Sequence, residues 1–161
     1  MSKEHLRPYT ACFTGHRTVP IVKRPVLRER LRETVEGLIK YGYCYFGAGG
    51  ALGFDTMAAE CVLELREIYP KIKLILVLPC RDQASKWSER DVRKYNEILE
   101  KCDKVTYVSD YYTDVCMLER NRRLVDGSSV CIAYKTRERG GTAYTVNYAY
   151  KCDVEVINLG E

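Results

Sequence analysis

The stretch YCYFGAGGALGFDTMAAE, residues 43–60, combines an apolar run, a glycine-rich loop and the start of an amphipathic segment. Residues 43–47 predict a β-strand, and the amphipathic segment predicts a helix from about Asp55 to Tyr69. Four glycines lie between the two elements, at Gly47, Gly49, Gly50 and Gly53. Glycines at this place expose backbone N–H groups beside a helix N-terminus, where the helix dipole favours an anion. The stretch therefore predicts a strand–turn–helix unit with an anion-binding turn.

Apolar runs and amphipathic segments alternate along the rest of the chain. Strands are predicted at 10–14, 43–47, 72–78, 104–108, 129–134 and 154–159, and helices at 25–41, 55–69, 88–101, 113–126 and 141–151. The run IKLILVL at 72–78 is apolar almost throughout, which is typical of a parallel strand buried on both faces. This order predicts an α/β protein, a Rossmann-like three-layer α/β/α sandwich with a mostly parallel sheet of about six strands.

The composition favours one globular domain spanning 1–161. Of the 161 residues, 46% are hydrophobic and 30% are charged, and the formal net charge of +4 suits a phosphate ligand without demanding nucleic acid. No apolar run is long enough to span a membrane, and the N-terminus lacks the apolar stretch of a secretory signal, so we expect a cytoplasmic protein. The eight cysteines form no CxxC pair, so we expect free thiols and no metal site.

Two further strand-to-helix loops carry polar groups that suit an anionic ligand. In the first, Gly15 lets the backbone approach a ligand, His16 stands at the crevice, and the Arg17 guanidinium offers a planar fork to phosphate. In the last, Thr142 follows two glycines at a predicted helix start, with cations just before them; a solvated run of charges is the alternative there. Asp55 can cap its helix, hold a ribose hydroxyl, or do both.

The helix before the fifth strand adds two candidates, because Arg120 and Asn121 are expected to reach the crevice. The predicted ligand-binding residues are Gly15, His16, Arg17, Gly49, Gly50, Gly53, Phe54, Asp55, Arg120, Asn121, Gly140, Gly141 and Thr142. The glycine spacing GxGxxxG is one residue longer than a dinucleotide fingerprint, and there is no GxxxxGK[ST] loop. These absences count against a dehydrogenase and a P-loop NTPase. Trp87 either covers the crevice or packs between helices, and packing is favoured.

Several motifs, taken together and in order, resemble the YpsA-like branch of the SLOG superfamily. They are FTGHR at 13–17, GGALGFDTMAAE at 49–60, Gln83 with Trp87, ERN at 119–121 and GGTAYT at 140–145. This superfamily joins the DNA-processing protein DprA to the LOG proteins, and the resemblance covers nearly the whole chain. It implies a Rossmann-like fold, a nucleotide-related ligand and, because LOG-type relatives are commonly dimers, a homodimer.

LOG-type relatives are phosphoribohydrolases with a PGGxGTxxE motif preceded by an Arg-Lys pair. In this chain Arg120 fits the arginine, but Asn121 replaces the lysine. Thr142 fits the threonine of the motif, but the expected glutamates are absent. A hydrolase of this type needs a carboxylate, and the candidates are Asp55 and Glu60. Whether the chain is an enzyme therefore stays open.

Three functions remain under consideration. The first is binding, or sensing, of a nucleotide or a nucleotide-derived phosphate ligand such as an ADP-ribose-like molecule, without a cofactor or metal. The second is LOG-type cleavage of the N-glycosidic bond of a nucleoside monophosphate. The third is DprA-like binding of single-stranded nucleic acid, motivated by the basic residues at 135–139 and the many tyrosines. The modest net charge argues against a nucleic-acid partner.

Overall fold

The computed structural model describes residues 3–160, in which six parallel strands form one sheet. The strands are β1 (Thr10–Gly15), β2 (Tyr45–Ala48), β3 (Lys73–Leu78), β4 (Lys104–Tyr107), β5 (Val130–Tyr134) and β6 (Glu155–Asn158). Their order across the sheet is β4-β3-β2-β1-β5-β6, and every neighbouring pair is parallel. The predicted α/β, Rossmann-like fold is confirmed.

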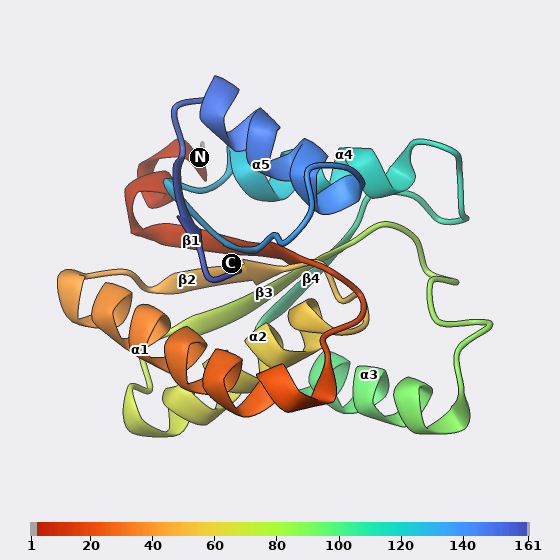
Figure 1. Cartoon of the computed structure of the whole chain (residues 1–161), viewed down its shortest axis with the longest axis horizontal. Coiled ribbons are helices and arrows are strands. Elements are labelled where there is room, and N and C mark those ends of the chain that lie inside the picture. The colour runs from red at the N-terminus through yellow and green to blue at the C-terminus, as the bar shows by residue number, and fades with distance from the viewer. Residues whose placement is uncertain (1–2, 161) are drawn as a thin grey trace.

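Helices cover both faces of the sheet (Figure 1). On one face lie α1 (Arg24–Tyr41), α2 (Phe54–Ile68) and α3 (Glu89–Lys101), and on the other lie α4 (Cys116–Asp126) and α5 (Gly141–Lys151). Two short 3₁₀ helices, η1 (Lys3–Tyr9) and η2 (Ile21–Lys23), precede β1 and α1. No helix in the described part of the chain is both long and apolar enough to cross a bilayer. All eight cysteines are free thiols.

Two element boundaries differ from the predicted ones, at the end of α1 and at the start of α4. The strand predicted from residue 43 begins at Tyr45, because the N–H of Tyr43 donates to the Leu38 carbonyl and so belongs to the C-terminal turn of α1. Gly42 closes that helix in the left-handed region, with φ of 116°. The helix predicted from residue 113 begins at Cys116, after a short turn.

The core lies on both sides of the central strands and supports the carboxyl end of the sheet. The ring of Phe13 in β1 lies 6.3 Å from the ring of Phe46 and 6.3 Å from that of Phe54. The Phe54 ring lies in turn 5.9 Å from that of Tyr134 at the end of β5. This aromatic cluster joins the ends of β1 and β5 to the first turn of α2, so it holds the loops that follow these strands in a fixed relation.

The strand order creates a topological switch point beside β1. From β1 the chain moves outward through β2 and β3 to β4, and it then returns to the opposite side of β1 with β5 and β6. The loops after β1 and β5 therefore leave the sheet in opposite directions and open a crevice between them. In open parallel sheets, ligands bind at such a point.

Candidate functional site

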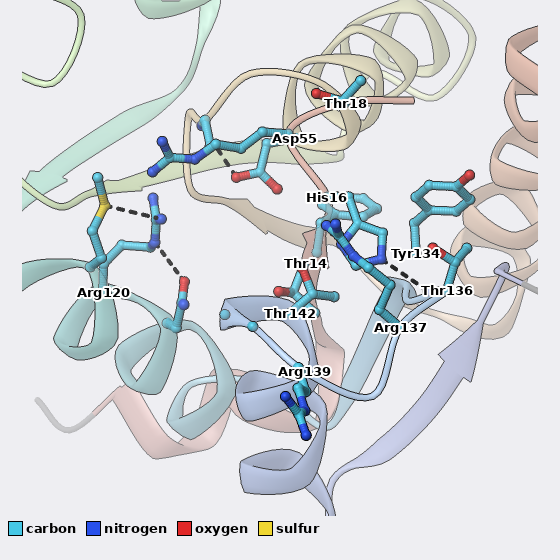
Figure 2. Close-up of a pocket in the computed structure, with 18 of the residues that line it drawn as sticks. Thr14, His16, Thr18, Asp55, Arg120, Tyr134, Thr136, Arg137, Arg139 and Thr142 are labelled. Atoms are coloured by element: carbon cyan, nitrogen blue, oxygen red, sulfur yellow. Dashed lines mark hydrogen bonds between the residues drawn. The ribbon is translucent and has the colours of Figure 1, made fainter. Parts of the chain in front are cut away.

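A cavity of about 560 Å³ occupies the crevice at the carboxyl ends of β1 and β5. Three parts of the chain line most of it: residues 13–18, which are the end of β1 and the loop that follows; the first turns of α4; and the loop from β5 into α5 (Figure 2). The side of the cavity formed by α4 carries Arg120, and the side formed by the β5–α5 loop carries Arg137. The site thus draws on segments that are far apart in the sequence.

The lining is strongly cationic. Five of its side chains carry a positive charge and one carries a carboxyl group; the cations are Arg17, Lys23, Arg120, Arg137 and Arg139, and the carboxyl group is that of Asp55. Within residues 3–160, none of the five cations lies within ion-pair distance of a carboxylate. Because like charges concentrated in a concave site raise its potential, the cavity favours an anion.

Asp55 is the buried carboxyl group of the cavity, with 6% of its surface exposed. Its Oδ2 accepts the N–H of Ala51 at 3.2 Å, whereas Oδ1 has no hydrogen-bond partner among residues 3–160. Burial raises the pKa of Asp55, and the neighbouring Arg120 opposes that rise. The N-cap of α2 is Gly53, so Asp55 does not cap the helix as one of its predicted roles required. An unpaired buried acceptor is costly, and a ligand hydroxyl or N–H group would satisfy it.

Arg120 is held in place by protein groups on three sides. Its Nε donates to Oδ1 of Asn121 at 2.7 Å, one terminal nitrogen donates to the Gly49 carbonyl, and the other lies 3.6 Å from the Met117 sulfur. Burial lowers the pKa of Arg120, and the charge of Asp55 opposes that effect. The guanidinium is therefore positioned in advance, at a cavity wall, beside the unpaired carboxyl group.

The glycine-rich loop of residues 47–53 packs closely against Arg120 and Asp55. Of the loop and the helix start that follows it, Ala51 and Asp55 line the cavity, whereas Gly49, Gly50, Gly53 and Phe54 do not. A Cβ atom on Gly49 would lie 2.5 Å from Nη1 of Arg120 and 2.9 Å from Oδ2 of Asp55. These glycines permit close packing, and the predicted contact of this loop with an anion stays a prediction.

The N-terminus of α2 is not open to an anion either. The His16 carbonyl accepts the N–H of Phe54 at 3.1 Å, and the Asp55 carboxyl group lies in the first turn. A helix N-terminus that already holds a carbonyl and a carboxyl group has lost much of its attraction for a further anion.

The N-terminus of α5 is open. Its N-cap is Gly140, with φ of 100°, and no side chain caps the helix. The first hydrogen bond of the helix runs from Tyr144 N to the Gly140 carbonyl at 3.0 Å, so the N–H groups of residues 141–143 have no partner within the helix. Gly140, Gly141 and Thr142 all line the cavity. This is the terminus at which an oxyanion would find unpaired donors.

The predicted site residues fall into three groups: those that line the cavity; Gly49, Gly50, Gly53 and Phe54, which do not line it; and Glu60, which lies away from it. Those that line the cavity are Gly15, His16, Arg17, Asp55, Arg120, Asn121, Gly140, Gly141 and Thr142. Glu60 lies elsewhere, in a groove between α1 and α2, where its Oε2 pairs with Nζ of Lys94 at 3.4 Å. Trp87 packs its ring against that of Tyr95, 5.3 Å away, and does not line the cavity.

Sequence reasoning missed several lining residues. Lys23 enters through η2, a short 3₁₀ helix with no periodic pattern to reveal it. Tyr134 is the last residue of β5, and its place at the carboxyl end of a predicted strand was a usable signal. Arg137 and Arg139 belong to the recognised basic run, but its Lys135 pairs instead with Glu138 at 3.1 Å.

Comparison with known proteins identifies relatives across most of the chain. The model of the YspA SLOG family matches residues 12–156. A UPF0398 protein of Halalkalibacterium halodurans is 29% identical over 140 residues, which cover 85% of this chain and 71% of the relative. The SPbeta prophage-derived protein YoqJ of Bacillus subtilis is 30% identical over 138 residues, which cover 78% of this chain and 81% of YoqJ.

Two solved structures share the fold. DNA processing protein A from Helicobacter pylori, studied for its binding of single-stranded DNA, superposes with a TM-score of 0.65 at 21% identity. DNA processing protein A from Streptococcus pneumoniae superposes with a TM-score of 0.67 at 16% identity. The matches cover 96% and 94% of this chain but only 66% and 50% of the two proteins, so the chain spans about two thirds of one and half of the other.

Proposed function

This chain belongs to the YspA SLOG family, and we propose that its cavity binds a nucleotide or a nucleotide-derived phosphate ligand, such as a molecule of the ADP-ribose kind. The observation that carries the proposal is the coexistence, in one cavity, of a surplus of cations and a buried Asp55 whose Oδ1 lacks a partner. A ligand that is only an anion would satisfy the cations and leave the carboxyl group unpaired. A ligand with both phosphate and hydroxyl groups satisfies both.

The size and the layout of the cavity support a ligand of this class. Its volume of about 560 Å³ lies within the range of small-molecule sites, which is roughly 300–1,000 Å³. Donors for phosphate oxygens are provided by the N-terminus of α5 and by Arg137 and Arg139, and an acceptor for a sugar hydroxyl is provided by Asp55. We therefore infer that the phosphate lies toward α5 and the sugar toward Asp55.

Calorimetry with adenosine, AMP, ADP and ADP-ribose tests this proposal. We expect the phosphate-bearing ligands to bind and adenosine to bind at least ten-fold more weakly. Asp55→Asn should weaken binding of AMP by about 10- to 100-fold, the range for a hydrogen bond to a charged group, and leave binding of inorganic phosphate unchanged. Glu60→Gln is the matched control, because it removes a carboxylate from α2 outside the cavity. Absence of binding by the folded protein to any phosphate-bearing ligand would contradict the proposal.

One observation favours a second candidate, N-glycosidic hydrolysis. Because burial raises the pKa of Asp55, this carboxyl group is tuned toward the proton exchange that a general acid or base performs. Chromatography of nucleoside monophosphates incubated with the protein would detect the released base. Release that Asp55→Asn abolishes supports the hydrolase; nucleotide binding without release supports the binder.

Binding of single-stranded nucleic acid and formation of a homodimer both stay predictions. The Helicobacter pylori relative in fold binds single-stranded DNA, and the cationic cavity would accept a backbone phosphate. A gel shift with an oligonucleotide, repeated at rising salt, tests the first, because phosphate contacts weaken steeply as salt increases. Analytical ultracentrifugation tests the second.

A further inference from the structure

His16 follows β1 directly, and both nitrogens of its ring face hydrogen-bond donors (Figure 2). Only 7% of the residue is exposed. Nε2 lies 2.9 Å from the backbone nitrogen of Thr136, and Nδ1 lies 3.2 Å from Nη2 of Arg137. A backbone N–H group can only donate, so Nε2 must accept and cannot carry a proton. In a neutral imidazole the proton then lies on Nδ1.

The contact between His16 and Arg137 consequently joins two donors. The guanidinium of Arg137 has N–H groups and no acceptor, and Nδ1 of His16 bears the ring proton. No other hydrogen bond and no ion pair is formed by the Arg137 side chain within residues 3–160. Burial and the charge of Arg137 both lower the pKa of His16, which keeps the ring neutral. Two donors thus converge at the cavity wall without an acceptor between them.

We propose that Nδ1–H of His16 and the guanidinium of Arg137 together bind one oxygen of the ligand's phosphate, with His16 acting as a neutral donor. The proposal rests on the proposed function and specifies where the phosphate binds. A phosphate oxygen only accepts, and it can take two donors at once. The other oxygens lie toward the open N-terminus of α5, which is carried by the same loop as Arg137.

The hydrogen bond between His16 and Thr136 gives the imidazole ring a second, structural role. It connects the end of β1 to the loop that leads from β5 into α5, and it therefore positions the donors of that loop relative to the donor on the ring. His16 is in this respect both a binding residue and a positioning residue. The two roles depend on different nitrogens, which makes them separable by substitution.

Two variants separate these roles. The amide of His16→Gln reaches the place of Nε2 and can accept the N–H of Thr136, but it leaves no donor at the place of Nδ1. The amide of His16→Asn lies near the place of Nδ1 and can donate there, but it leaves the N–H of Thr136 without an acceptor. We expect His16→Gln to keep the wild-type stability and lose affinity for phosphate. We expect His16→Asn to lose stability and retain more of the affinity per folded molecule.

Nitrogen NMR of the ring tests the tautomer in the unmodified protein. The chain contains two histidines, His5 and His16, so labelled histidine gives two sets of ring signals, and His16→Gln assigns them. The wild-type spectrum should show His16 protonated on Nδ1 and unprotonated on Nε2. Inorganic phosphate should move the Nδ1 signal of His16 and leave both signals of His5 in place. A ring protonated on Nε2, or an Nδ1 signal that saturating phosphate does not move, would overturn the proposal.

Titration with phosphate, pyrophosphate and AMP measures the contribution of the pair. His16→Gln and Arg137→Gln should each weaken binding by about ten-fold or more, and the double variant should lose less than the product of the two, because both donors bind one oxygen. Arg93→Gln is the control, since it removes the same charge from the exposed face of α3. Wild-type affinity in both single variants overturns the proposal.

The same titrations distinguish failure of this proposal from failure of the proposed function. If AMP binds and neither His16→Gln nor Arg137→Gln weakens it, the nucleotide site stands and the phosphate lies elsewhere. If phosphate binds in a way that depends on His16 and Arg137 but no nucleotide binds more tightly than phosphate, the phosphate position stands and the nucleotide function falls.

Discussion

Replacing Gly49 by alanine should destabilise the protein, although alanine at an ordinary position usually does the opposite. The added Cβ would lie 2.5 Å from Nη1 of Arg120 and 2.9 Å from Oδ2 of Asp55, and contacts this short are not tolerated. Gly49 does not have a positive φ, so the backbone itself accepts alanine. The cost therefore falls on the side chains, and the buried guanidinium has to move away from the Gly49 carbonyl to which it donates.

The magnitude follows from the bond that is lost. A hydrogen bond from a charged group contributes about 1.5–3 kcal/mol. Alanine also reduces the conformational entropy of the unfolded chain, which stabilises the folded state by about 0.4–1 kcal/mol. The net loss for Gly49→Ala is then about 0.5–2.6 kcal/mol, which in a chain of this size lowers Tm by roughly 1–10 °C.

Urea denaturation of Gly49→Ala beside Gly37→Ala measures the effect with a matched control. Gly37 lies on the exposed side of α1, and a Cβ there would meet nothing within 4 Å. Alanine in a helix interior is favoured over glycine by about 0.5–1 kcal/mol, so Gly37→Ala should raise the midpoint. The urea midpoints of the two variants should shift in opposite directions from that of the wild type, and their m-values should be equal. A midpoint for Gly49→Ala at or above that of the wild type would refute the packing argument.

Three further outcomes are expected. Burial raises the pKa of Asp55, so the folded state binds the proton more tightly than the unfolded chain does. The free energy of unfolding should therefore fall as pH rises from about 3.9 to the higher folded pKa. Urea midpoints measured across this pH range should fall less in Asp55→Asn than in the wild type. Burial raises the pKa of Cys61 to about 12, so Cys61→Ser should leave the rate of native thiol labelling at pH 8 unchanged. Asp103 accepts both the N–H of Leu74 at 2.8 Å and Nη1 of Arg66 at 2.7 Å, so Asp103→Ala should cost about 1–3 kcal/mol and Arg66→Ala less; the reverse order in urea denaturation would contradict this.

The fold was predictable because its signals are local and repeat. Each buried strand reads as an apolar run, as in LILVL at 74–78, and each helix has apolar residues at helical spacing, as in α1 with Leu27, Leu31 and Val35 buried. Errors occurred at boundaries, where tertiary hydrogen bonds decide which residue still belongs to a helix. The bond from Tyr43 to Leu38, which delays β2, has no signature in the local sequence.

The site was only partly predictable, because glycine has two uses that a sequence does not separate. A glycine-rich turn before a helix can expose N–H groups to an anion, or it can let two side chains approach the backbone. At Gly49 the second use applies, and what approaches is Arg120, which lies 71 positions away in the chain. The hydrogen bond from the N–H of Phe54 to the His16 carbonyl at the N-terminus of α2 is likewise a tertiary contact, and no local sequence motif predicts it.

The two helices that begin at the crevice explain how the cavity would orient a ligand. Both α2 and α5 start with a glycine N-cap that no side chain assists, so their backbones offer similar donors. The N–H of Phe54 at the start of α2 donates to the His16 carbonyl and lies beside a carboxyl group, whereas the N–H groups of residues 141–143 have no partner within α5 and lie among cations. The side of the cavity at α2 therefore carries a buried acceptor, Asp55, beside the donor Arg120, whereas the side at α5 carries donors. The proposed ligand, with a sugar at one end and a phosphate at the other, would satisfy Asp55 when a sugar hydroxyl lies there, because the reverse orientation would place the phosphate against this carboxyl group.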